Sequence, residues 1–421
     1  MPIGAVLQLG AYGPQDKLLT GNPQITYFKF VYKRYSNFAL EEYEQYFNGK
    51  VDFGKKVYCD FDRIGDLISN IDLYIELPSL YQTEEENEDE LLQRSWVNSI
   101  GHALIKNVEI EIGGIIIDKH YGVWMEIWSE LTIDSDKKDG YYNMIGKHEN
   151  FNASIQSGPL YLTVPLQFWF CKNPGLALPL IALQNSKIRL NLTFRNLDEL
   201  WISNYANDEL LLPLTITESH LNVNYIFLED DERRKFANMD HCYLIEQLQI
   251  HPQSLNTKDK VNVINLDFNH PCKELIWVVQ NESVLIRTSN GGNEWFNFSD
   301  RQYNSNTGPG GGLTPKDNLV NTVLKINGED RFKIKNALYF RTVQPFNFHT
   351  NVPDNFIYCY SFALKPEDIK PSGTCNFSRI DNLTLNIEII DNLTNPMILI
   401  FTTNYNFFEI QNGIGGIKYL D

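Results

Sequence analysis

The sequence has few of the patterns that mark a chemical site. Its six cysteines stand far apart, with no Cys-x-x-Cys pair, which argues against a zinc frame and against a secreted disulfide scaffold. Reduced, mostly buried thiols are expected instead. Its eight histidines never occur as His-x-His or His-x-x-x-His, the spacings that bring two imidazoles together. The sequence therefore predicts no enzyme, with no catalytic residue, no cofactor site and no metal site.

Long apolar runs and basic clusters are also missing. No apolar stretch approaches the roughly 20 residues of a membrane-spanning helix, and the N-terminus lacks the basic region of a signal peptide. These absences predict a soluble protein that is not exported by the ordinary route. The 36 Lys and Arg are outnumbered by 53 Asp and Glu, which gives a net charge of −17. Because such a surface repels phosphates, direct binding of nucleic acid is not expected.

Alternating apolar and polar residues are the dominant pattern that is present. In KIRLNLTF (187–194) the apolar and polar residues would face opposite sides of a strand. The same alternation occurs in three further segments, Ile71–Leu77, Val261–Phe268 and Leu383–Ile389. Val108–Asp118 reads as a hairpin that turns at Gly113-Gly114, where φ is positive. These patterns predict an all-β protein.

The length of 421 residues suits two domains of about 200 residues each. The break is expected near Leu212–Glu218, where Pro213 interrupts the strands. No clean sequence repeat relates the two halves. The residue pattern alone predicts two antiparallel sandwiches or barrels and does not choose between them.

Two helices and three long loops interrupt the strands. An aromatic stripe in Tyr121–Leu131 has helical spacing and is interpreted as core packing rather than a ligand site. A shorter helix is expected to begin near Asp230. The acidic run Thr83–Glu90 is expected to be an exposed loop, because consecutive like charges repel and stay solvated. Asp134–Gly158 and Asn290–Gly312 are the other two loops. The latter contains GPGGG (308–312), which lacks the Lys-Ser/Thr of a phosphate-binding loop.

Three local features invite a chemical interpretation. Ser361–Asn382 contains Cys375, but no base is evident, and its prolines and glycine fit a connection between strands. His241 and Cys242 would point to opposite faces of a strand and cannot form a dyad. Seven Asn-x-Ser/Thr sequons occur, and those in or beside predicted loops are the candidate glycosylation sites: Asn152, Asn281 and Asn297.

Several long segments, in a fixed order, resemble the major capsid proteins of nucleocytoplasmic large DNA viruses, the group that includes iridoviruses, algal viruses and giant amoebal viruses. Leu7–Ala39 looks like the N-terminal hallmark of that family, and Ser361–Asn382 like its C-terminal signature. Four further segments match between and after them: Leu178–Leu192, Tyr243–Gln249, Lys273–Gln280 and Asn404–Tyr419. Together the matches extend from one end of the chain to the other.

The resemblance implies a double jelly roll, two eight-stranded antiparallel sandwiches in tandem, with short helices and long loop insertions. The expected divisions are an N-terminal arm (1–23), a first jelly roll (24–214) and a second (215–421). The resemblance also implies homotrimeric, pseudo-hexagonal capsomers that tile an icosahedral shell in the virion, assembled in the host cytoplasm. The expected partners are neighbouring capsomers, minor capsid proteins and the inner membrane side of the virion. The loops at Asp134–Gly158 and Asn290–Gly312 would face the host.

Two alternatives remain open at this point. The chain could be a minor double-jelly-roll component, or a membrane scaffold, of the same viruses, and abundance in virions would separate these roles from that of a major capsid protein. A carbohydrate-binding or carbohydrate-processing sandwich is the third hypothesis. No cluster of aromatic and carboxylate residues in the sequence points to it.

Overall fold

The computed structural model describes residues 3–81, 86, 94–148, 159–203, 205, 208–211, 213–287, 292–301 and 315–420. The chain forms two compact units, Met1–Asn37 and Phe38–Asp421. The first unit contains two short helices, α1 (Ile3–Gly10) and α2 (Asp16–Thr20). Large apolar side chains in this unit are open to solvent, among them Phe28, which is 99% exposed.

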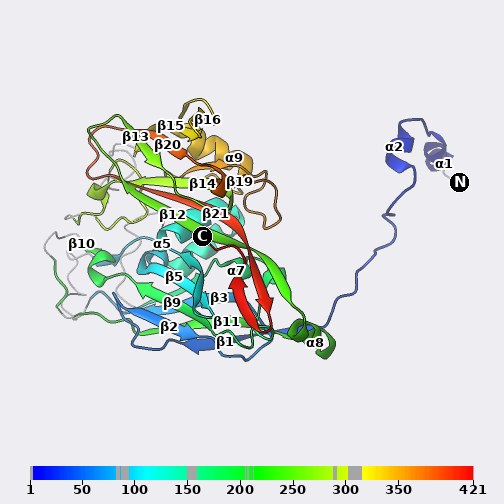
Figure 1. Ribbon diagram of the computed structural model, residues 1–421, viewed down its shortest axis with the longest axis horizontal. Coiled ribbons are helices and arrows are strands. Elements are labelled where there is room, and N and C mark those ends of the chain that lie inside the picture. Colours follow the sequence, from blue (N-terminus) through cyan, green and yellow to red (C-terminus); the bar gives the residue numbers. More distant parts are fainter. Residues whose placement is uncertain are drawn as a thin grey trace. The chain divides into compact units, whose positions relative to one another are not determined.

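The second unit contains two sets of antiparallel strands, shown in the lower and upper parts of Figure 1. Eight strands make up the main sheets of the first set: β1 (Phe38–Tyr46), β2 (Lys56–Asp60), β3 (Leu67–Leu77), β5 (Ile105–Ile112), β6 (Ile115–His120), β7 (Leu160–Pro165), β9 (Ile188–Phe194) and β11 (Glu218–Leu228). They form one sheet in the order β1-β11-β3-β7 and another in the order β2-β9-β5-β6.

The second set repeats this arrangement. Its main strands are β12 (His241–Ser254), β13 (Val261–Asn265), β14 (Pro271–Gln280), β15 (Leu319–Ile326), β16 (Glu329–Asp330), β18 (Tyr358–Ser361), β20 (Leu383–Ile389) and β21 (Met397–Gln411). The sheets run β12-β21-β14-β18 and β13-β20-β15-β16. When the eight main strands of each set are numbered 1 to 8 along the chain, both sets have one sheet in the order 1-8-3-6 and another in the order 2-7-4-5. This confirms the expected double jelly roll.

The strand pairing also shows where the first set ends. β11 is its eighth strand and pairs with both β1 and β3. It therefore belongs to the first jelly roll by its hydrogen bonds, although it begins after residue 214, where the sequence placed the division.

Short strands extend these sheets, and one pair forms a small sheet of its own. The extensions are β8 (Leu178–Pro179), β17 (Lys335–Asn336), β19 (Cys375–Asn376) and β22 (Ile414–Ile417). The separate pair is β4 (Arg94–Trp96) with β10 (Trp201–Ser203).

The helices of the second unit lie in the connections between strands. In the part of the chain that the structure describes they include α4 (Ile100–Leu104), α5 (Gly122–Thr132), α6 (Lys138–Ile145), α7 (Trp169–Lys172), α8 (Asp230–Asn238) and α9 (Gln344–Phe348), with a π-helical turn, η6 (Tyr339–Val343). The expected helices at Tyr121–Leu131 and near Asp230 are confirmed as α5 and α8. The expected loop Asp134–Gly158 is wrong in its first part, because α6 occupies it; residues 149–158 lie outside the described part.

The alternation that predicted the strands reflects burial. In β9 the side chains of Ile188, Leu190, Leu192 and Phe194 are buried, as expected. The hairpin of β5 and β6 turns at Gly113 and Gly114, whose φ values of 62° and 87° confirm the predicted turn. Most of the buried apolar side chains of both jelly rolls belong to one continuous cluster. The two jelly rolls therefore share a core.

Candidate functional site: the junction of the two jelly rolls

The two jelly rolls meet edge to edge. β6, at one edge of the first roll, contacts β12, at one edge of the second. The Leu248 backbone N–H donates to Asp118 Oδ1 at 3.0 Å, and Gln247 Nε2 donates to the carbonyl of Ile117. Asp118 is buried and also pairs with His120 Nε2 at 2.9 Å. Its carboxylate therefore has partners on both sides of the junction, as a buried charge requires.

Helix α5 brings an aromatic stripe to the same junction. Trp124 stacks on Trp128 with ring centroids 5.3 Å apart, and it lies 5.4 Å from the ring of Phe401 in the second roll. The Lys172 ammonium lies 4.6 Å from the ring centroid of Trp128. The interpretation of this stripe as core packing is confirmed, since both tryptophans are buried. Their large apolar area joins the two rolls.

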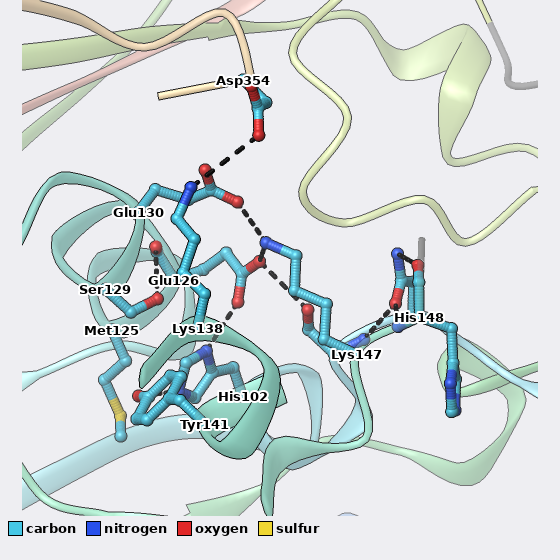
Figure 2. A network of polar contacts seen from close by, with 12 residues as sticks. His102, Met125, Glu126, Ser129, Glu130, Lys138, Tyr141, Lys147, His148 and Asp354 are labelled. Carbon is cyan, nitrogen blue, oxygen red and sulfur yellow. Dashed lines mark hydrogen bonds and ion pairs between the residues drawn. The ribbon is translucent and has the colours of Figure 1, made fainter. Parts of the chain in front are cut away.

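A buried ionic network lies on the other side of α5 (Figure 2). Glu126 accepts hydrogen bonds from Lys147 Nζ at 2.8 Å and from Ser99 Oγ at 3.0 Å, and it contacts His102 Nδ1 at 2.6 Å. Lys147 also pairs with Glu130. Burial alone would raise the pKa of Glu126, but Lys147 and His102 outweigh it and lower the pKa to about 2. The carboxylate is therefore ionised at neutral pH.

A loop of the second roll covers the end of α5. The backbone N–H of Asn351 donates to the carbonyl of Leu131 at 2.9 Å, and Asn351 Nδ2 donates to the carbonyl of Ile133. Nearby, Lys138 in α6 lies 3.9 Å from Asp354 (Figure 2). Because the last carbonyls of a helix have no partner within the helix, this loop supplies donors that α5 itself lacks.

A second ionic network crosses the junction directly. Glu246 in β12 lies 3.0 Å from Lys172 of the first roll and also pairs with Lys273 of β14. Lys273 is completely buried and donates to the carbonyl of Pro366 as well. Burial raises the pKa of Glu246, yet the two lysines dominate and hold it below its usual value. Separating the rolls would leave these charges without partners.

The segment Ser361–Asn382 supports this network rather than presenting a nucleophile. Besides the Pro366 carbonyl, it contributes Glu367, which accepts from the Thr350 backbone at 2.8 Å and contacts His349 Nδ1 at 3.0 Å. His349 is buried, with its Nε2 atom 3.0 Å from Glu274. Burial raises the pKa of the Cys375 thiol, the opposite of what an activated thiolate needs.

Cation–aromatic contacts join the rolls at another point. The guanidinium of Arg287 lies 3.8 Å from the ring centroid of Trp201, and that of Arg195 lies 3.7 Å from Trp295. The Trp295 indole N–H donates to the carbonyl of Glu199 at 2.7 Å. Each pair has one member in each roll. Together with the networks above, these contacts make the two rolls one rigid block.

Comparison with known proteins shows the family to which the chain belongs. A family model described as "Major capsid protein N-terminus" matches residues 26–229, and one described as "Large eukaryotic DNA virus major capsid protein" matches residues 232–416. The chain belongs to this family. Its role is structural, as a capsid protein, and the resemblance seen in the sequence is confirmed.

Individual relatives agree with the family models. The major capsid protein of Pyramimonas orientalis virus is 40% identical, with 99% of each chain covered. The major capsid protein of Paramecium bursaria Chlorella virus 1 is 36% identical, with 99% of each chain covered. A chain of the solved structure titled "PBCV-1 virus capsid, quasi-atomic model" has a TM-score of 0.79 at 32% identity, over 94% of this chain and 100% of that chain.

Two of the three candidate glycosylation sites of the capsid protein do not offer open side chains. Asn281 and Asn297 are each only 2% exposed. The Asn281 amide donates to the carbonyl of Asp300, and that of Asn297 to the carbonyl of Arg301. A glycan on either nitrogen would displace these contacts, so their surroundings do not support glycosylation of the folded chain. Asn152 lies outside the described residues.

The other sequence candidates do not converge on one site. His241 contacts the carbonyl of Phe236 at 2.8 Å, whereas Cys242 is exposed. Thr83–Glu90, apart from Glu86, and Gly308–Gly312 lie outside the described residues. Residues 292–301 of the expected loop Asn290–Gly312 belong to no helix or strand, but the expected exposure is wrong there, because Asn293, Phe298 and Ser299 are buried.

Among the described residues, no group of three His, Cys, Asp or Glu side chains could hold a metal ion. In the same residues, no helix is both long and apolar enough to cross a membrane. The residues that matter for this capsid protein are instead those of the junction. Sequence reasoning missed most of them, because partners such as Lys172 and Glu246 lie 74 positions apart.

Proposed function

We propose that three copies of this chain form a homotrimeric, pseudo-hexagonal capsomer that tiles the shell of a large icosahedral virus. The observation that carries the proposal is the repeated strand order of two jelly rolls joined into one block. Three such blocks around a threefold axis present six similar wedges, and closed symmetric rings are the usual form of protein oligomers. The chain then acts as a building block and not as an enzyme.

The proposed domain boundaries follow the strand pairing. The first jelly roll would extend from β1 through β11, that is from residue 38 to residue 228, and the second from β12 onwards. The helix α8 between them is the link. This proposal replaces a division at residue 214, which would separate β11 from its partners β1 and β3.

Partners outside the trimer are proposed for the first unit. Met1–Asn37 exposes many apolar side chains, including Leu18, Tyr27 and Phe28. Exposed apolar surface of this extent is typical of a segment that a partner covers. We expect it to bind a neighbouring capsomer or a minor capsid protein on the membrane side of the shell. Assembly in the host cytoplasm and host contact through outer loops belong to the same proposal.

The mass of the purified chain in solution tests the proposal. Native mass spectrometry should find a species of about 146 kDa, three times the chain mass of 48.8 kDa. Abundance of this chain in purified virions would separate a major from a minor capsid role. A chain that stays monomeric at all concentrations, or is scarce in virions, would contradict a major capsid protein that forms trimers by itself.

A further inference from the structure

The joined edges of the two jelly rolls have counterparts that are open in a single chain. When the main strands are numbered within each roll, strand 1 (β1 or β12) ends one sheet and strand 5 (β6 or β16) ends the other. Strand 5 of the first roll, β6, contacts strand 1 of the second, β12. The corresponding pair is β16 and β1. Within the described part of the chain, β16 pairs only with β15 and β1 only with β11.

The two strand-5 edges are built alike. β6 follows a two-residue turn at Gly113-Gly114, and β16 follows one at Asn327-Gly328, where φ is 51° and 87°. In both hairpins these positive φ values give the same tight reversal. β16 and the residues after it therefore occupy the place in the second roll that β6 occupies in the first.

The open edge at β1 is acidic and partly apolar. Glu41, Glu42 and Glu44 are exposed, and so are Leu40 and Tyr46, at 61% and 60%. Of the nine residues in this strand, only Gln45 is buried. An edge strand this exposed is unusual in a finished structure, because it invites pairing with another chain.

The open edge after β16 carries the opposite charge. β16 itself is acidic (Glu329–Asp330), but residues 331–338, RFKIKNAL, include three basic residues and no acidic one, in a chain whose net charge is −17. Arg331, Lys333 and Lys335 are exposed. Between and beside them, Ile334 and Leu338 are 65% and 51% exposed. The two open edges are thus complementary in charge, and both also carry apolar side chains.

We propose that β1 of one copy packs against residues 331–338 of a second copy, and that this contact repeats the β6–β12 contact inside each chain. The inference rests on the proposed trimer and names its surfaces. Each copy uses two different edges, so the contact is head-to-tail, and in the proposed trimer three such contacts close the ring. The opposite charges set the partner and the orientation, and the apolar side chains become buried.

Charge reversal tests the two edges separately and together. One variant carries Glu41→Lys and Glu42→Lys, and another carries Lys333→Glu and Lys335→Glu. In each, like charges face one another, and the concentration at which half the chains are trimeric should rise by about tenfold or more at low salt. The chain that carries all four changes should recover trimers, because every contact again joins opposite charges. Sedimentation and native mass spectrometry give these concentrations.

A matched control carries Lys258→Glu and Lys260→Glu. These exposed lysines precede β13, at the opposite edge of the sheet that contains β16, and their reversal should leave the trimer unchanged. Circular dichroism establishes that each variant is folded. If the unaltered chain forms trimers and both edge variants do so equally well, or the combined variant does not recover, these edges are not the contact. If the unaltered chain stays monomeric, the proposed trimer itself fails.

Discussion

Glu126 and Glu130 lie buried on α5 and both pair with Lys147, so that removal of one charge takes a partner from the others. A buried ion pair need not add to stability relative to an apolar core, but breaking one is costly. The ionisation state of Glu126 therefore couples the stability of the fold to pH. Its folded pKa of about 2 lies below its ordinary value of 4.5.

Acid should destabilise the folded chain through this residue. Between about pH 4.5 and pH 2 the unfolded chain binds a proton that the folded chain does not, so stability falls as pH falls. Glu126→Gln should cost about 3 kcal/mol at pH 7 and flatten the pH dependence in that window. Urea unfolding at pH 7, 5 and 3 measures both effects. Glu209→Gln, at an exposed position, should change neither; equal pH profiles for all three chains would contradict this role.

Sequence reasoning reached some single residues and not others. The inward positions of β9 follow from alternation alone. In β13, by contrast, Val261 and Val263 are exposed and Asn262 is buried. The Asn262 side chain exchanges two hydrogen bonds with the backbone of Asn256 in the preceding turn. A local polar contact of this kind can bury an asparagine where valines on the other face stay exposed. The alternation of apolar and polar residues does not predict it.

At the scale of elements, α5 can pack closely against α4 because Gly122 has no side chain. A Cβ atom added to Gly122 would lie 2.1 Å from the carbonyl oxygen of His102 and 2.5 Å from that of Ile105. Both are backbone atoms, which cannot turn aside as a flexible side chain can. The close approach brings the aromatic stripe of α5 to the junction.

Two glycines in helices should therefore respond differently to alanine. Gly122→Ala should destabilise the chain by more than about 3 kcal/mol, because the helix must move and the junction with it. Gly140→Ala, in α6, meets nothing within 4 Å and should be neutral or stabilise by up to about 1 kcal/mol. Thermal unfolding of the two variants compares them directly. Similar melting temperatures would mean that α5 is free to shift.

Elements were predictable where their periodicity is strong. The stripe of Tyr121–Leu131 marked α5 to within one residue at each end. α6 was missed because its sequence, KDGYYNMI, is polar and contains a glycine, which lowers helix propensity. The burial of Tyr141 and Ile145 against the first roll stabilises this helix despite its low helix propensity.

At the scale of the whole molecule, two jelly rolls with the same strand order share one apolar core. The repeat was not visible in the sequence, since strand order depends on which strands pair and not on which residues they contain. The resemblance to a family supplied it. The division at residue 214 was placed by a proline, whereas the pairing of β11 depends on contacts more than 140 positions away.

The second unit should unfold as one body. Because the core and the Glu246 network cross the junction, neither roll is complete alone, and a single cooperative transition is expected on heating. A fragment of residues 38–229 should expose the α5 stripe and aggregate or remain unfolded. Calorimetry of the full chain and circular dichroism of the fragment measure this. Two separate transitions, or a stable folded fragment, would show that the rolls are independent.

The peptide link between β11 and β12 has a consequence for assembly. Bringing two free bodies together costs translational and rotational entropy, by estimates of about 4–15 kcal/mol for each association. A ring of six separate wedges would meet that cost five times, whereas the three linked pairs of the proposed trimer would meet it twice. The link through α8 thus transfers most of the entropic cost from capsid assembly to the folding of one chain.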